Sequence, residues 1–181
     1  MESKMKDPVD ELKRLERGGA EAAFPEGHVV VLVPVRCESG SSKVVLSRIV
    51  EVMTVVVRQL VGGNWPALDG WRRLLPSWFV EKCAEEQDAE QAERWLAWWR
   101  SLPPAEQASA VANAPWTLAN WLHWFEPGPN QRQWIWWKGE VESEDLLSVV
   151  LIAESWPIAH GAFNWIVRAA GAIPLEETLW S

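Results

Sequence analysis

The chain contains no tyrosine, only two cysteines and only three histidines among its 181 residues. The cysteines, Cys37 and Cys83, are too few for a disulfide framework or a cysteine-rich zinc site. The histidines, His28, His123 and His160, lie far apart in the sequence and lack the close spacing of paired metal ligands. We therefore expect neither a metal ion nor any other cofactor.

The sequence also lacks a long uninterrupted apolar run. Its most apolar stretch, residues 44–61, is broken by Arg48, Glu51 and Arg58, which makes it a poor transmembrane segment. Residues 1–8 are charged and lack the apolar core of a secretory signal peptide. These absences, together with the scarcity of cysteine, predict a cytoplasmic protein.

The chain has fewer basic than acidic residues. Lysine and arginine number 17 against 25 aspartate and glutamate residues, which gives a formal net charge of -8. Nucleic-acid binding needs clustered basic side chains that displace counterions, and anionic membrane surfaces repel an acidic protein. The same charge favours a basic protein partner, because opposite charges accelerate the encounter. We expect a protein partner, but neither nucleic acid nor membrane, and the composition leaves the oligomeric state open.

Tryptophan is unusually abundant, with 15 residues in a chain that is 48% hydrophobic and 23% charged. A chain of this length buries roughly 70% of the surface that its unfolded form exposes. It cannot bury all these indoles completely, so some are expected in grooves or at a contact surface, where tryptophan is enriched. The alternative is a core and rim that simply use tryptophan in place of other residues.

The hydrophobic pattern predicts an α+β fold, in which a small and mainly antiparallel sheet of about three strands packs against several helices. Apolar runs at residues 28–35, 133–138 and 146–154 are typical of strands, and the last two of a hairpin. Apolar residues at helical spacing predict a buried helix over residues 42–61, although many β-branched residues leave a strand pair open there. Further helices are expected over residues 76–84, 88–102, 103–112 and 115–125, and after Pro157.

The first part of the chain differs in composition from the rest. Residues 1–27 are predicted to form a polar N-terminal segment with one short helix, which Asp7 caps and Gly18 ends. Residues 28–181 are predicted to form a single α+β domain, because no long linker or internal repeat interrupts them.

The loop that follows the first predicted strand is the best candidate for chemistry. It has the sequence RCESGSSK, from Arg36 to Lys43, and leads into the predicted buried helix. A helix start offers free N–H groups and the positive end of the helix dipole, which together suit an anion. A thiol at Cys37, beside Arg36, would have a lowered pKa there and would be partly ionised.

The spacing Cys37-x-x-Gly40-x-x-Lys43 resembles the phosphate-binding loop of cysteine-dependent phosphatases. The resemblance implies that Cys37 attacks phosphorus while the residue at position 43 clamps the phosphate oxygens. This sequence has Lys43 where that family has arginine, and lysine cannot make the bidentate contact. The alternative interpretation is a turn of serine and glycine in which Ser41 or Ser42 caps the helix.

Candidate binding residues lie in and near the predicted hairpin. Alternation along its first strand places Trp134 and Trp136 on one face, and these indoles could wall a ligand pocket together with the helices. Trp124, His123 and Arg36 complete the set of candidate binding residues.

Two acidic clusters favour an interaction with a basic partner, although solvated faces have the same composition. Their members are Glu81, Glu85, Glu86, Asp88, Glu90 and Glu93 in the first, and Glu140, Glu142, Glu144 and Asp145 in the second. The main hypothesis is a non-enzymatic protein-interaction domain, of the kind found among acidic immunity or adaptor proteins that bind a basic partner. The alternative is a cysteine-dependent enzyme that uses Cys37, with Arg36, Lys43 and the loop amides as an anion cradle.

Overall fold

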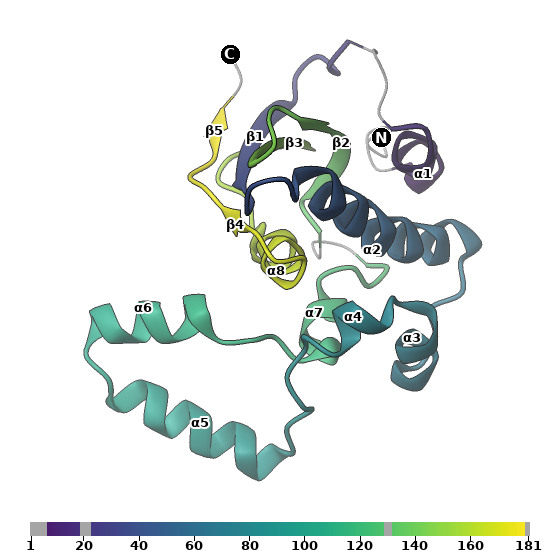
Figure 1. Ribbon diagram of the computed structural model, residues 1–181. Coiled ribbons are helices and arrows are strands. Elements are labelled where there is room, and N and C mark those ends of the chain that lie inside the picture. Colours follow the sequence, from purple (N-terminus) through teal and green to yellow (C-terminus); the bar gives the residue numbers. More distant parts are fainter. Residues whose placement is uncertain (1–6, 19–22, 129–131, 180–181) are drawn as a thin grey trace.

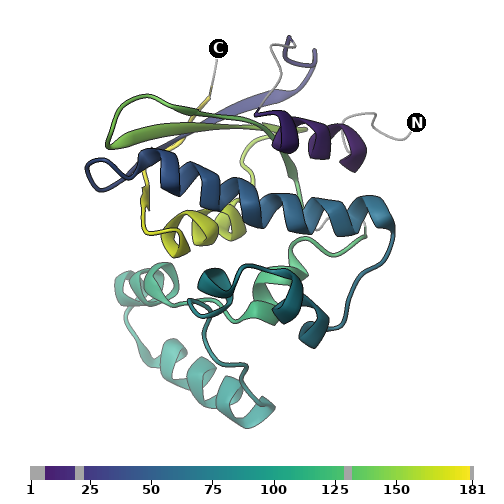
Figure 2. The ribbon, with the colours of Figure 1, turned by 45° about the vertical axis from the view of Figure 1, so that its right-hand side comes forward.

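The computed structural model describes residues 7–18, 23–128 and 132–179 (Figure 1). Its helices are α1 (Pro8–Arg17), α2 (Ser42–Gly62), α3 (Leu68–Leu74), α4 (Ser77–Val80), α5 (Ala89–Ser101), α6 (Pro104–Asn113), α7 (Leu118–His123) and α8 (Gly161–Ala169). Its strands are β1 (Val29–Arg36), β2 (Trp134–Val141), β3 (Leu146–Ala153), β4 (Ile173–Pro174) and β5 (Thr178–Leu179). The predicted α+β class is confirmed, since an antiparallel sheet packs against helices (Figures 1 and 2).

The sheet has five strands, in the order β2-β3-β1-β4, and β5 also pairs with β1. All strand pairings within the sheet are antiparallel, and β1 runs alongside β3 from the pair Val29 and Ala153 to the pair Arg36 and Leu146. The three predicted strands correspond to β1, β2 and β3. The sequence pattern misses β4 and β5, because strands of two residues are too short to show alternation.

Residues 42–62 form one continuous helix, α2, so the strand-pair alternative is wrong. Its β-branched residues are accommodated because Val45, Ile49 and Val52 lie on a buried face. Burial of each such side chain stabilises the fold by about 1.5–3 kcal/mol, which exceeds the loss of helix propensity at a β-branched residue. Gly63 ends the helix with left-handed backbone, at a φ of 63°.

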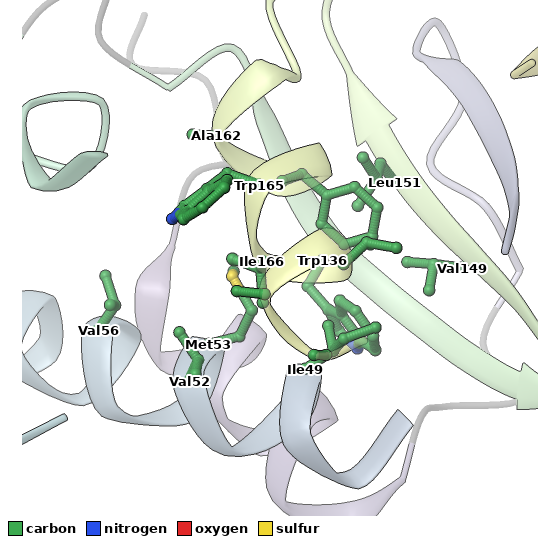
Figure 3. Close-up of a cluster of buried hydrophobic side chains, with 14 of the residues drawn as sticks. Ile49, Val52, Met53, Val56, Trp136, Val149, Leu151, Ala162, Trp165 and Ile166 are labelled. Atoms are coloured by element: carbon green, nitrogen blue, oxygen red, sulfur yellow. The ribbon is translucent and has the colours of Figure 1, made fainter. Parts of the chain in front are cut away.

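Helices α2 and α8 cover one face of the sheet and enclose the main core with it (Figure 3). Met53 of α2, Ile166 of α8 and Trp136 of β2 meet there and are almost completely buried. A smaller apolar cluster lies on the other face of the sheet, around Ile152 and Trp137. Alternation along β2 therefore divides its side chains between two apolar clusters, as the sequence predicts.

Helix α1 begins and ends where the sequence predicts. The Asp7 carboxylate accepts a hydrogen bond from the Val9 N–H at 2.9 Å, and Gly18 closes the helix at a φ of 80°. The helix packs against α2 and β2. Its buried Glu11 carboxylate bonds to the Arg132 guanidinium at 2.7 Å, so charge as well as apolar contact holds α1 in place.

Three helices differ from the predictions. Helix α3 is missed altogether, because it has 7 residues and contains Gly70, a poor helix former. The helix predicted over residues 76–84 is reduced to α4, which ends at Val80. Helix α8 begins at Gly161 and not at Pro157, which lies in a bend after a cis peptide bond. Proline suits both helix starts and turns, so the local sequence does not separate the two.

Helices α5 and α6, residues 89–113, form a hairpin that projects from the rest of the structure (Figures 1 and 2). The hairpin begins with a capping box, in which the Asp88 carboxylate accepts from the Gln91 N–H at 2.8 Å. At its base, the Ala84 N–H donates to the Trp116 carbonyl at 2.9 Å, where Ala84 pairs with Thr117. The two ends of the hairpin segment are therefore joined. We call the sheet together with the other helices the body.

Candidate functional site

A cavity of about 580 Å³ lies between the α5–α6 hairpin and the body. The hairpin contributes Trp95 of α5 and Val111 of α6 to its lining, while α8 contributes Gly161 and Asn164. Most of the other described lining residues come from α7 and from the segment that joins α6 to α7. The volume of the cavity falls within the range of small-molecule binding sites.

Aromatic rings make up much of the cavity wall. The rings of Trp116 and Trp124 lie 6.5 Å apart at an interplanar angle of 57°. Trp95 belongs to the hairpin, where its ring stacks on that of Trp99 at 6.4 Å and 13°. His123 adds a further ring to the lining. The three lining indoles are each half-buried, so part of their surface remains open to contact.

Several polar groups in and beside the cavity are held by contacts of their own. The Thr117 hydroxyl caps α7 by accepting from the Asn120 N–H at 3.2 Å. The Glu86 carboxylate accepts from the Ala119 N–H at 3.0 Å and so fixes the first turn of α7. Asn164 differs, because its Oδ1 is buried and has no hydrogen-bond partner in the part of the chain that the structure describes. A buried acceptor without a partner costs about 1–3 kcal/mol.

The described lining carries basic but no acidic side chains. Its basic members are Arg168 and His123. A ring nitrogen of His123 lies 3.4 Å from the Glu126 carboxylate, and Arg168 is engaged in a contact of its own. The cavity therefore presents aromatic surface and amide groups more than charge.

The structure divides the predicted binding residues among three places. His123 and Trp124 line the cavity together. Trp134 and Trp136 are each 1% exposed and belong to the main core, so their indoles do not wall the pocket that we expected around them. The reason is that α8 covers this face of β2. Arg36 is exposed at the end of β1 and is not among the described lining residues.

Two residues of the aromatic wall, Trp95 and Trp116, are not among the predicted binding residues. Trp95 belongs to a stripe of tryptophan on α5, and an apolar stripe on a helix normally faces the core. Trp116 follows Pro115 in a connecting segment that has no periodic pattern. The sequence contains one signal for this wall. Helix α5 has more tryptophans than a short projecting helix can bury.

The thiol of Cys37 is unlike the ionised thiol that the sequence predicts. Cys37 is 8% exposed, and burial, with a further contribution from Asp145, raises the pKa of its thiol instead of lowering it. The predicted low pKa is therefore wrong. The side chain belongs to the main core, where a thiolate would lose its hydration. Lys43 is exposed at the start of α2.

The backbone N–H groups of the same loop are already bonded. Those of Gly40 and Ser42 both donate to the Glu144 carbonyl, at 3.0 and 3.3 Å. The N–H of Cys37 donates to the Asp145 carbonyl at 2.8 Å. The turn between β2 and β3 thus occupies amides that a bound anion would need. Ser41 is the N-cap residue of α2, as the alternative interpretation predicts, but its side chain makes no capping hydrogen bond.

The described residues form neither a metal site nor a reactive cysteine site. Among the described residues, no three histidine, cysteine or carboxylate side chains come together to hold a metal ion. Burial raises the pKa of the second cysteine, Cys83, to about 11, so this thiol is protonated at neutral pH. Within the same described ranges, no helix has the length and apolar character required to cross a bilayer.

The α5–α6 hairpin carries an exposed apolar surface in addition to the cavity wall. Trp98 is 51% exposed and is not among the described lining residues, whereas Val111 is equally exposed and belongs to the cavity wall. Helix α5, which the structure describes completely, has no buried side chain. Carboxylates are frequent along this helix and just before it: Glu85, Glu86, Asp88, Glu90 and Glu93. The hairpin therefore presents indole and carboxylate groups side by side in the sequence.

The chain has no match among protein-family models, curated proteins or solved structures. Its function therefore has to be inferred from the contacts of its own residues. Two features require an explanation: the exposed surface of the hairpin around Trp98, and the aromatic cavity beneath the hairpin.

Proposed function

We propose that this chain is a non-enzymatic protein-interaction domain and that its α5–α6 hairpin binds a basic protein partner. The observation that carries the proposal is that α5 bears Trp95, Trp98 and Trp99 yet has no buried side chain. Helices in folded proteins gain most of their stability by burying an apolar face. A partner that covers Trp98 would supply the contact that α5 lacks.

Contacts within the hairpin support this role, because they hold the Trp99 ring in place and set the Trp98 ring beside Trp95. The Trp99 indole N–H donates to the Gln107 carbonyl at 3.1 Å, and the Gln107 side-chain amide donates to the Leu102 carbonyl at 3.0 Å. The Trp98 ring lies 6.3 Å from the ring of Trp95. A pre-ordered indole loses little conformational entropy on binding and is a frequent hot spot of protein interfaces.

The charge near the hairpin supports a basic partner. Residues 81–93 contain six carboxylates against one basic residue, Lys82. Carboxylates beside an apolar contact attract lysine and arginine on a partner and accelerate the encounter. An immunity- or adaptor-type protein that binds a basic protein would combine these features.

The cysteine-dependent alternative has less support. Burial raises the pKa of the Cys37 thiol, and the N–H groups of Gly40 and Ser42 are bonded to the neighbouring turn. A nucleophilic thiol needs a lowered pKa and an accessible position. We therefore assign the proposed functional surface to the hairpin.

A random peptide library displayed on phage provides probes that require no knowledge of the partner. Selection against the whole chain should enrich peptides that combine lysine or arginine with a large apolar residue. Trp98→Ala should weaken the binding of a selected peptide by about tenfold or more, as expected for a hot-spot residue. Binding should also weaken as the salt concentration rises, since exposed charges are screened.

Trp156 provides a matched control, because it is 40% exposed but lies outside the hairpin. Trp156→Ala should leave the affinity for the selected peptide unchanged. Enrichment of acidic or uncharged peptides would contradict the proposal. An equal loss of affinity in Trp98→Ala and Trp156→Ala would contradict it as well.

A further inference from the structure

We infer that the cavity between the α5–α6 hairpin and the body binds a small, neutral, planar heteroaromatic compound that carries an N–H donor. This site is separate from the proposed partner surface, because Trp98 is not among the described lining residues. Indole is the simplest compound of the class, and we use it as the probe.

The size and walls of the cavity favour a planar ring. Its volume of about 580 Å³ falls within the range of small-molecule sites, and the cavity is partly open to solvent. Trp116 and Trp124 line it from the body, and Trp95 lines it from the hairpin. Indole side chains contact flat aromatic compounds by offset stacking or edge to face, with a gain beyond burial alone.

The charges of the lining favour a neutral compound. None of the described lining residues is a carboxylate, so a cationic ligand would find no counter-charge inside the cavity. The basic residues Arg168 and His123 already have contacts of their own, the latter with Glu126. Enclosing a charge without a partner is costly. A neutral ring needs neither a carboxylate nor a free basic side chain, so its binding does not carry this cost.

Asn164 selects for a hydrogen-bond donor. It belongs to the cavity lining, and its Oδ1 is buried without a partner among the described residues. Oδ1 is shielded from solvent, so a ligand reaches it only when the half-buried Asn164 side chain rotates toward the cavity. A ring N–H that donates to Oδ1 satisfies the acceptor, whereas a ring without a donor leaves it unsatisfied.

A compound in this cavity would join two parts of the fold. Trp95 and Val111 belong to the hairpin, whereas Gly161 and Asn164 belong to α8. A ligand that contacts both walls would stabilise the hairpin against the body. Hydrogen exchange of the amides in residues 89–113 should therefore slow when the ligand binds.

The first experiment compares indole with benzofuran, which has nearly the same shape but replaces the N–H with an oxygen. Binding to the isotope-labelled full chain is followed by NMR, through the indole N–H signals. Indole should shift the signals of Trp95, Trp116 and Trp124 saturably, and benzofuran should bind about tenfold more weakly. Asn164→Leu should abolish this difference while both compounds still bind.

Two substitutions should block the cavity from opposite walls. A Cβ atom at Gly161 would lie in ordinary contact with the Trp116 ring, at 3.4 Å, so the larger side chain of Gly161→Leu would occupy space beside this lining residue. Val111→Phe adds volume from α6. The matched control is Gly62→Leu, since no described atom lies within 4 Å of a Cβ atom there. The blocking variants should lose indole binding, and the control should keep it.

Trp98→Ala should bind indole normally, which separates this site from the proposed partner surface. Equal affinity for indole and benzofuran would overturn the inference. Indole binding that survives both Gly161→Leu and Val111→Phe would overturn it too, because the compound would then bind elsewhere. So would unchanged hydrogen exchange in the hairpin at saturating indole.

Discussion

Glu11 on α1 and Arg132, just before β2, form a bidentate ion pair in which both N–H···O distances are 2.7 Å. Glu11 is completely buried, and its carboxylate also accepts the backbone N–H of Trp136 at 2.7 Å. One side chain thus joins the first helix to an edge strand of the sheet and satisfies an N–H group that this edge would otherwise leave unpaired.

Glu11→Ala should lower the free energy of unfolding by about 3–5 kcal/mol, because the largely buried Arg132 would lose its partner. Urea unfolding followed by tryptophan fluorescence measures the change. Glu16→Ala is the control, since its pair with Arg58 is exposed and contributes at most about 1 kcal/mol. Equal losses in the two variants would show that the buried pair does not hold α1 to the sheet.

Two tryptophans should respond very differently to truncation. Trp136 is 1% exposed in the main core, so Trp136→Ala should destabilise the protein by about 3–5 kcal/mol. Trp98→Ala should change the free energy of unfolding by only about 0.5 kcal/mol, because half of that side chain is already in solvent. Thermal and urea unfolding of both variants test this. A large loss in Trp98→Ala would mean that this indole stabilises the hairpin and is not kept for a partner.

The thiol of Cys37 should react slowly with iodoacetamide at neutral pH, and phosphate should not slow it further. Burial raises the pKa of this thiol, and the nearby amides are bonded to the turn between β2 and β3. Mass spectrometry of the Cys83→Ala variant measures the rate from about pH 6 to 9. Rapid modification that phosphate suppresses would restore the hypothesis of an anion site at Cys37.

Alkaline pH should destabilise the protein through Cys83. Burial raises the pKa of this thiol from 9.0 to about 11, so it ionises more readily in the unfolded chain than in the folded one. Its contribution to stability is therefore complete below pH 9.0 and is lost as the pH rises toward about 11. Urea titrations across this interval should show a steeper fall for the wild type than for Cys83→Ala. Identical slopes would contradict the assignment.

The fold could be predicted wherever a local sequence pattern is enough to define a helix or strand. The run of valines in β1 indicates a strand covered on both faces, and the sequence from Asp88 to Gln91 marks the start of α5. Helix α2 is harder, because its β-branched residues suit a strand equally well and only burial against the sheet decides between the two. Strands β4 and β5 have two residues each, so the sequence shows no local pattern for them.

The candidate site could not be predicted, because its features depend on segments that are distant in sequence. Alternation shows that Trp134 and Trp136 share a face, but only the position of α8 shows that this face is closed. The amides of Gly40 and Ser42 look available until the Glu144 carbonyl is placed beside them. Local sequence thus identifies the residue types of a site but not their neighbours.

The hydrogen bond between Ala84 and Trp116, at the base of the hairpin, has an evolutionary consequence. The chain leaves the body and returns to it at adjacent points, so residues 85–115 can vary in length and composition without moving the strands of the core. Selection for a new specificity can therefore act on this one segment. The remaining residues form a scaffold that descendants can retain while they diverge in what they bind.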